Sequence, residues 1–283
     1  MNGGILELNG KGITGASRGA TINGGTIRNS SSTACGIAGP LVIGGNCTII
    51  GDAGFVNFTS VNSQILNGTV TLGGTTGGNF TAGAATNSSL NIIKNDAGTW
   101  TFNKNLLVTG NNTTTINAGI LQLNPNSNST YNSAIILNGG TFSSVGFAGT
   151  STTPRVLTCT SLQLQSSSTI ALGTDVNKLN QIKFNDSHSI AWTNGATLTV
   201  TGWTGTAGNA GTVGRLFVLP NGTTNVGLTP SQLAQISFIG YANTSAMLTL
   251  GGEVIPITMP IVTAASSATV DAPFNITFGD QAA

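Results

Sequence analysis

A short phrase returns along the chain: an asparagine, usually with glycine, followed by residues that alternate between apolar and polar. Its first four copies begin, at a spacing of roughly 21–23 residues that is typical of stacked repeats, at Asn2, Asn23, Asn46 and Asn67. In the fourth copy, Val70 and Leu72 fall on one face of a strand and the threonines between them on the other. Asn and Gly tolerate the positive φ of turns, whereas Thr, Ile and Val favour strands. The pattern therefore predicts a turn and then a strand in each copy.

Three later copies of the phrase begin at Asn117, Asn138 and Asn194. A unit this small cannot bury its own apolar face, so the units must stack on one another. A leucine-rich repeat would place Asn or Cys after a Leu-x-x-Leu-x-Leu frame, and that frame is missing. Here Asn and Gly precede the strand, and three strands with three turns take roughly 20 residues. We therefore predict an all-β fold, a right-handed parallel β-helix with rungs of roughly 22 residues.

A β-sandwich is the alternative fold, because Asn-Gly hairpin turns would also give short strands and frequent turns. It accounts less well for the even spacing of the first four copies of the phrase.

The pattern divides the chain into three predicted regions, which are the parallel β-helix repeats at 1–177, a C-terminal β-rich cap module at 178–256, and a linker with extended strands at 257–283. The two short strands of the last region cannot fold alone in water. They are therefore expected to be disordered, to pack back on the rod, or to add to the sheet of another subunit. The residues that would form such an inter-subunit strand are Val262, Val270, Phe274, Ile276 and Phe278.

The cap module contains the one convincing helix signal. Thr229 is the predicted N-cap, Pro230 the first helical residue, Ser231–Ile239 the body, and Gly240 the end. Because a solenoid needs its open end covered, and because aromatic residues concentrate in this region, we expect this module to close the rod.

Charge is unusually scarce. Charged residues make up 6% of the chain and the formal net charge is +1, against about 25% charged residues in an ordinary soluble domain. There is no basic patch for nucleic acid and no apolar run long enough to span a bilayer. A neutral β surface lacks the usual protection against edge pairing, which favours an extracellular or cell-surface location, self-association, or both. Met1 runs directly into repeat material without a secretion signal, which favours a mature form or an internal fragment.

The chain has three cysteines, Cys35, Cys47 and Cys159. Cys35 and Cys47 are close enough in sequence to join one rung to the next as a disulfide, which would leave Cys159 free. Three buried, reduced cysteines in the core are the alternative. The spacing fits no metal site.

Residues Ile116–Leu123 read Ile-Asn-Ala-Gly-Ile-Leu-Gln-Leu, and Ile92–Phe102 precede them with a Thr-Trp-Thr-Phe strand. Together they resemble the autotransporter-associated β-strand repeat of bacterial surface proteins. The first half departs from that family at Asn95 and Asp96, where the family prefers glycine. The resemblance implies secretion and a β-helical fold, and it carries no catalytic residue.

Two further stretches resemble parts of such surface proteins. Gly227–Phe238, with Gly252–Pro256, is similar to the C-terminal end of many repeat-containing surface proteins. Residues 257–283 resemble the opening of an immunoglobulin-like domain of large bacterial surface proteins.

Candidate catalytic chemistry is sparse. A polysaccharide lyase or glycosidase needs two or three acids, or an acid with a base, in one groove, and the best candidates for such acids are Asp175, Asp186 and Glu253. The nearest local cluster is Lys178, Lys183, Asp186 and His188. There, the Asp-Ser pair most simply makes a turn with His188 at its edge. We predict no catalytic residue, cofactor or metal.

The aromatic side chains Trp192, Trp203 and Tyr241 could stack on sugars, although capping the solenoid is the simpler role. The run Thr113–Thr115 brings ice binding into consideration as a function. A flat threonine face, however, needs threonines in register over many rungs, which the copies do not supply. The sequence thus predicts a non-enzymatic extracellular structural or adhesive bacterial surface protein that forms a fibre or stalk. Its partners would be further copies of itself, and also glycans or a neighbouring cell surface. The alternative is a β-helical polysaccharide-binding module or polysaccharide-degrading enzyme.

Overall fold

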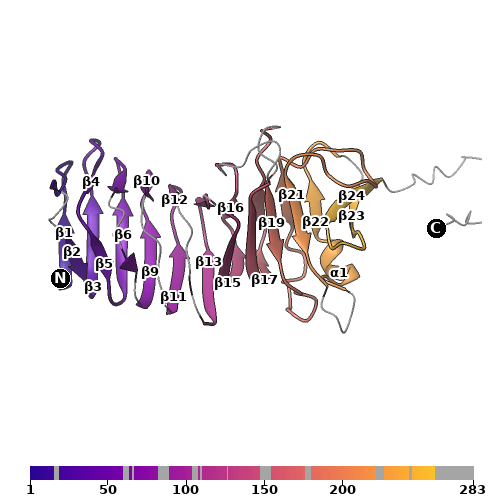
Figure 1. The fold of residues 1–283 in the computed structure, drawn as a ribbon, viewed down its shortest axis with the longest axis horizontal. Helices are drawn as coiled ribbons and strands as arrows, with labels where there is room; N and C mark the ends of the chain where they lie inside the picture. Colours follow the sequence, from indigo (N-terminus) through magenta and orange to yellow (C-terminus); the bar gives the residue numbers. More distant parts are fainter. Residues whose placement is uncertain are drawn as a thin grey trace, which may run out of the picture.

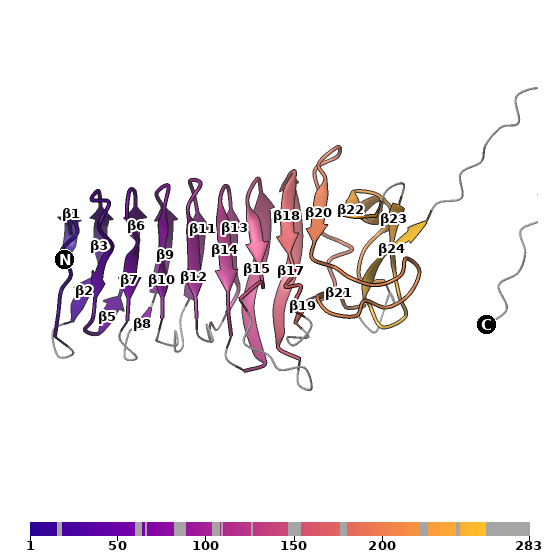
Figure 2. The same cartoon turned by 90° about the horizontal axis from the view of Figure 1, so that it is seen from above.

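The computed structural model describes residues 1–15, 19–59, 64–65, 67–81, 89–103, 108, 110–125, 127–146, 154–175, 180–220, 226–241 and 244–258. Within these residues the chain forms a parallel β-solenoid, whose strands follow one another along the long axis of the molecule (Figure 1). The view from above shows the same stack, with β1 at one end and the pair β23 and β24 at the other (Figure 2). This confirms the predicted solenoid. It excludes the β-sandwich, whose hairpin-linked strands would pair antiparallel.

Ten strands form the first long sheet, here called sheet A, and every neighbouring pair in it is parallel. In spatial order they are β1 (Asn2–Glu7), β3 (Gly24–Asn29), β6 (Cys47–Gly51), β9 (Asn67–Gly73), β11 (Ser89–Lys94), β13 (Asn112–Ile116), β15 (Ser129–Asn138), β17 (Val156–Ser166), β19 (Gln181–Phe184) and β21 (Arg215–Val218).

Nine parallel strands form the second long sheet, sheet B. In spatial order they are β22 (Ile236–Phe238), β20 (Leu198–Thr201), β18 (Ser168–Ala171), β16 (Thr141–Ser143), β14 (Ile120–Leu123), β12 (Thr99–Phe102), β10 (Gly77–Phe80), β7 (Val56–Phe58) and β4 (Cys35–Ile37). The remaining elements are a three-stranded sheet of β2 (Ala20–Ile22), β5 (Leu41–Ile43) and β8 (Gln64–Ile65), the antiparallel pair β23 (Thr244–Leu248) and β24 (Val254–Thr258), and the helix α1 (Pro230–Leu233).

The core lies between the sheets and repeats from rung to rung. Because side chains alternate along a strand, each strand sends every second residue inward. Phe58, Phe80 and Phe102 occupy equivalent positions on three neighbouring strands of sheet B. Their rings stack, with centroids 4.6 Å apart for the first pair and 4.5 Å for the second. Because these strands are parallel and in register, the three rings form a continuous apolar column.

The recurring Asn-Gly phrase marks two different corners of the solenoid. In the first four copies it lies where the chain enters sheet A, at β1, β3, β6 and β9. In the later copies it lies where the chain passes from sheet A to sheet B, before β14, β16 and β20. Glycine serves both corners in the same way, since Gly25 (φ 97°) and Gly119 (φ 62°) adopt positive φ. The phrase recurs once per rung at whichever corner it lies, so its spacing alone could not show which corner it occupies.

Asparagine side chains connect successive rungs at the second kind of corner, here called the A–B corner. The Nδ2 of Asn117 donates to the Oδ1 of Asn95 at 2.8 Å, and the Nδ2 of Asn138 donates to the Oδ1 of Asn117 at 2.8 Å. The hydroxyl of Ser166 then donates to Asn138 at 2.9 Å. A side-chain amide offers both a donor and an acceptor, so it can extend such a ladder in both directions.

A buried lysine closes one of these corners. The ammonium group of Lys94 donates to the backbone carbonyl groups of Asn95, Asp96 (2.7 Å) and Ala118 (3.0 Å), and the residue is fully buried. The three acceptors match the three hydrogens of the ammonium group. Burial lowers the pKa of Lys94 to about 8, and the negative charge of Asp96 acts in the opposite direction.

Two predicted boundaries are wrong. Residue 177 is no border between repeats and cap, because β19 to β22 continue the two long sheets beyond it. The helix is also shorter than Ser231–Ile239, since α1 ends at Leu233 and Ile236–Phe238 form β22. The predicted N-terminus of the helix is confirmed: Thr229 accepts from the backbone of Gln232, and the Gln232 side chain accepts from the backbone of Thr229.

The predicted disulfide is absent. Cys35, Cys47 and Cys159 are free and buried. Cys35 begins a strand of sheet B and Cys47 begins a strand of sheet A, so the two thiols enter the core from different sheets. Burial raises the pKa of Cys47 to about 12 and also raises that of Cys159. The predicted inter-subunit strand residues Val262, Val270, Phe274, Ile276 and Phe278 lie outside the described residues.

Candidate functional site

The A–B corner changes character along the rod. In the middle of the molecule it is short: residues 117–119 link β13 to β14, and residues 139–140 link β15 to β16. Toward the C-terminal end it becomes long, with residues 185–197 between β19 and β20 and residues 219–235 between β21 and β22. The long corners make the surface of the rod less regular here than at the short A–B corners in the middle.

Two glutamines join these two long corners. The Nε2 of Gln232 donates to the carbonyl groups of Ser187 (3.0 Å) and Ile190 (2.8 Å). The Nε2 of Gln235 donates to the carbonyl groups of Thr193 (2.7 Å) and Ala196 (2.9 Å). One corner therefore lies against the next with its backbone polar groups satisfied, which fixes the shape of the surface between them.

Trp192 stands in that surface. Its indole Nε1 donates to the carbonyl of Leu162 at 3.2 Å, and the backbone N–H of the next residue, Thr193, donates to Leu164 at 2.8 Å. Both acceptors belong to β17, so the half-buried ring is held by the rung below.

Two hollows border Trp192. One, of about 620 Å³, is lined by Trp192, Asn194, Gly195, Ala196, Thr197, Ser231, Ala234 and Gln235. The other, of about 210 Å³, is lined by Trp192, by the residues from His188 to Ala191, and by Thr229, Ser231, Gln232 and Gln235. Both hollows include Trp192, Ser231 and Gln235, so they are parts of one groove. We call it the Trp192 groove.

The groove carries no net charge from its lining. Its polar side chains are amides and hydroxyls, apart from His188 at one end. The Nδ1 of His188 lies 2.7 Å and 2.8 Å from the two carboxylate oxygens of Asp186, and the backbone N–H of His188 also donates to that carboxylate at 3.0 Å. The predicted turn at Asp186 and Ser187 is thus present. Ser187 is buried, with its hydroxyl accepting from the backbone of Leu162 at 3.0 Å.

The other two aromatic candidates for sugar stacking are engaged elsewhere. Trp203 is buried and packs edge-on against Phe238 and Tyr241, with ring centroids 5.7 Å and 5.0 Å away. The hydroxyl of Tyr241 donates to the carbonyl of Gly205 at 2.7 Å. Of the three predicted aromatic residues, only Trp192 lines a described hollow.

The candidate catalytic carboxylates take part in separate contacts. Glu253 is buried, with its carboxylate 2.5 Å from the guanidinium of Arg215 and accepting from the backbone N–H of Gly211 at 2.9 Å. Asp186 is bonded to His188, and Asp175 is exposed after β18. Glu253 thus contacts Arg215 and Gly211, whereas Asp186 contacts His188.

The predicted cluster around Asp186 and His188 also included two lysines. The ammonium group of Lys183 lies 4.9 Å from the centre of the Phe217 ring, and Lys178 lies outside the described residues. Among the described residues, no group of three or more His, Cys, Asp or Glu side chains could hold a metal ion. No described helix is long and apolar enough to cross a membrane.

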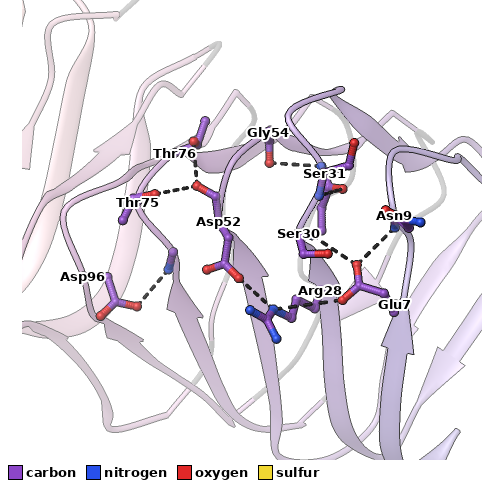
Figure 3. A network of polar contacts seen from close by, with 12 residues as sticks. Glu7, Asn9, Arg28, Ser30, Ser31, Asp52, Gly54, Thr75, Thr76 and Asp96 are labelled. Carbon is purple, nitrogen blue, oxygen red and sulfur yellow. Dashed lines mark hydrogen bonds and ion pairs between the residues drawn. The ribbon is translucent and has the colours of Figure 1, made fainter.

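The densest charged cluster is at the opposite end of the rod and is a surface network (Figure 3). The Nε of Arg28 lies 2.7 Å from the carboxylate of Asp52 and 4.0 Å from that of Glu7. Glu7 also accepts from the backbone of Asn9 and Ser30, both at 3.1 Å. Hydrogen bonds from Ser30 and charge from Arg28 lower the pKa of Glu7. These contacts link three successive rungs, as the asparagine ladder does further along.

No family model matches the chain, and neither a curated protein nor a solved structure is similar to it. The resemblance to autotransporter-associated repeats therefore stays a prediction.

The sequence named Trp192 but did not reveal the groove around it. Sequence reasoning did not identify Ser231, Gln232 and Gln235 as groove residues, because all three fall inside the predicted helix body Ser231–Ile239. The available signal was the long interval between the strand ending at Phe184 and the strand beginning at Leu198, which is far longer than the A–B corners that precede it.

Proposed function

We propose that this chain is a non-enzymatic structural and adhesive module of a bacterial cell surface, which acts through its extended outer faces. The observation that supports this most strongly is the composition of sheet B. Its nine strands contain no charged residue. A typical soluble surface is about 25–35% charged, so a neutral face of this extent is well suited to close contact with another surface.

From β16 to β22 the outward residues of sheet B are small and mostly polar, and several lie in register, whereas Ile120 holds the equivalent position on β14. Thr141, Thr169 and Thr199 occupy equivalent positions on three neighbouring strands, followed by Ser237 on the next. The threonine column spans three rungs, fewer than the many rungs that a flat threonine face needs. In sheet A the matching column Thr26, Thr48 and Thr71 ends at Ile93.

We assign a second copy of the chain as the partner of this face. Two identical neutral faces meet without like-charge repulsion, and a surface that contacts its own copy can close a symmetric pair. Hydroxyl and amide groups, each able to donate and accept, are self-complementary. Of the charged side chains in the network of Figure 3, Glu7 and Arg28 belong to strands of sheet A, and Asp52 directly follows β6 of the same sheet.

Lysine substitutions test the proposal. Thr141→Lys with Thr169→Lys places two positive charges on the outer face of sheet B, where both threonines are half-buried. The matched control is Thr48→Lys with Thr71→Lys on sheet A, also half-buried and in register. In sedimentation velocity we expect wild type and control to associate with rising concentration and the sheet B variant to remain monomeric. Equal behaviour of the two variants, or a monomeric wild type, would contradict the proposal.

A polysaccharide-degrading enzyme is the competing hypothesis. It requires two acids acting in one groove, and Asp186 is the carboxylate nearest the Trp192 groove, through His188. Depolymerisation of a neutral polysaccharide that disappears in Asp186→Asn would favour the enzyme over the structural module.

A further inference from the structure

We propose that the Trp192 groove binds a neutral polysaccharide, with the indole of Trp192 as its stacking platform. This inference rests on the proposed adhesive role, because it names the class of ligand that the adhesive module would bind. The groove lies at the A–B corner near the end of the rod, whereas the proposed self-contact uses the face of sheet B.

The shape of the groove is fixed before any ligand arrives. Gln232 and Gln235 tie one long corner to the next through four hydrogen bonds of 2.7–3.0 Å. The ring of Trp192 is held through its bond to Leu162. A site that is already ordered loses little conformational entropy on binding, so weak individual contacts can add to a useful affinity.

The extent of the groove fits a chain better than a single small molecule. Hollows of about 620 Å³ and 210 Å³ both border Trp192, and they share Ser231 and Gln235. A ligand that spans both hollows would pass over these three shared residues. Pockets for small ligands usually measure about 300–1,000 Å³, so the larger hollow has room for a small number of sugar rings and the smaller hollow extends it.

The chemistry of the lining selects a neutral, hydroxyl-rich ligand. Asn194 and Ser231 supply an amide and a hydroxyl group for hydrogen bonds to sugar hydroxyls, and Gln235 offers its side-chain oxygen, because its Nε2 already donates to Thr193 and Ala196. The indole supplies apolar ring surface for stacking on a sugar. His188 is the one ionisable side chain among the described lining residues, and its Nδ1 lies 2.7 Å from a carboxylate oxygen of Asp186. An anionic ligand would therefore meet no uncompensated cation among the described lining residues.

The direct test is isothermal titration of the full chain with neutral hexasaccharides. The probes are β-1,4-linked glucose, α-1,4-linked glucose and β-1,4-linked N-acetylglucosamine, with a sulfated oligosaccharide as the charged comparison. We expect at least one neutral probe to bind, with little dependence on salt, and the sulfated probe to bind more weakly. Trp192→Ala should weaken that binding by about tenfold or more, as loss of a central aromatic anchor does, whereas Trp192→Phe should retain most of it.

Two further variants separate binding from folding. Ser231→Arg places a bulky side chain on an exposed position shared by both hollows, and it should abolish binding without touching Trp192. Phe55→Ala removes an aromatic side chain that is 45% exposed at a distant corner, and it should leave binding unchanged. The inference is overturned if no neutral probe binds at millimolar concentration, or if Trp192→Ala and Ser231→Arg bind as the wild type does.

The two proposals can fail independently. The lysine variants of sheet B should lose self-association and keep hexasaccharide binding. Trp192→Ala should lose hexasaccharide binding and keep self-association.

Discussion

The ring of Trp100 lies over Gly78 on the neighbouring strand of sheet B. The two residues are in register, and a Cβ added at Gly78 would meet the backbone carbonyl oxygen of Val56 as well as the indole, whose Cζ3 would lie 2.8 Å away. The indole Nε1 donates to the carbonyl of Gly73 at 3.0 Å, and Trp100 is fully buried. A large side chain is thus accommodated in a narrow core because the next rung carries no side chain at that position.

We expect Gly78→Ala to destabilise the fold by about 1–3 kcal/mol, since overpacking a well-filled core forces the ring or the backbone to shift. Urea unfolding followed by circular dichroism measures this change. Gly3→Ala is the matched control, because a Cβ there would have no heavy atom within 4 Å. Equal stability of the two variants would contradict the close packing of the Val56 carbonyl and the Trp100 indole around Gly78.

Removing Lys94 should destabilise the protein strongly. Lys94→Met keeps the length of the side chain but leaves three backbone carbonyl groups without their donor. A buried polar group left unsatisfied costs about 1–3 kcal/mol, so we expect a total loss of roughly 2–4 kcal/mol after local relaxation. Lys11→Met, at an exposed position, is the control and should change stability little.

Lys94 should also produce a characteristic dependence on pH. Its pKa is lowered to about 8 in the folded protein from 10.5 in the unfolded chain, so the unfolded chain binds more protons between these values. Stability from this residue therefore rises as pH increases from about 8 toward 10.5.

The buried thiols oppose this trend. Burial raises the pKa of Cys47 and Cys159 above 9.0. The contribution of these thiols to the free energy of unfolding therefore decreases as pH rises above that value. The informative quantity is therefore the difference between wild type and Lys94→Met. As pH rises, the free energy of unfolding of the wild type should increase relative to that of the variant. A difference independent of pH between 7 and 10 would contradict the account of Lys94.

The asparagine ladder predicts a stability effect at a single surface corner. Asn117→Ala removes the donor to Asn95 and the acceptor of Asn138, and we expect a loss of about 1–2 kcal/mol. Asn209→Ala, at an exposed position away from the ladder, is the control. If both substitutions leave the urea midpoint unchanged, the ladder contributes nothing to stability.

The three thiols should be inert in the native protein. Cys35, Cys47 and Cys159 are at most 7% exposed, so a thiol reagent should modify none of them until denaturant is added and should then modify all three. A reducing agent should leave the melting temperature unchanged. Modification of a single thiol in the unreduced, denatured protein would instead reveal a disulfide.

Much of the architecture followed from local chemistry. The alternation at Val70 and Leu72 placed both in the core, where they are fully buried, and the spacing of the asparagines gave the length of a rung. The extent of the helix was less predictable, because Ile236–Phe238 also alternate, and pairing with β20 outweighs helix propensity there. Thr229 still began the helix as predicted, since a capping box acts locally.

The groove was beyond sequence reasoning for a different reason. Trp192 and Gln235 are far apart in the chain, and only the parallel stacking of consecutive A–B corners brings them to one surface. The same stacking buried Trp203 against Tyr241, although their sequence contexts did not distinguish them from Trp192.

The most direct test of the structural and adhesive role is electron microscopy of concentrated protein beside the Thr141→Lys, Thr169→Lys variant. The account predicts rods paired along the face of sheet B in the wild type and single rods in the variant, with the sheet A variant paired as in the wild type. Single rods in all three samples would contradict the assignment of sheet B as the contact face.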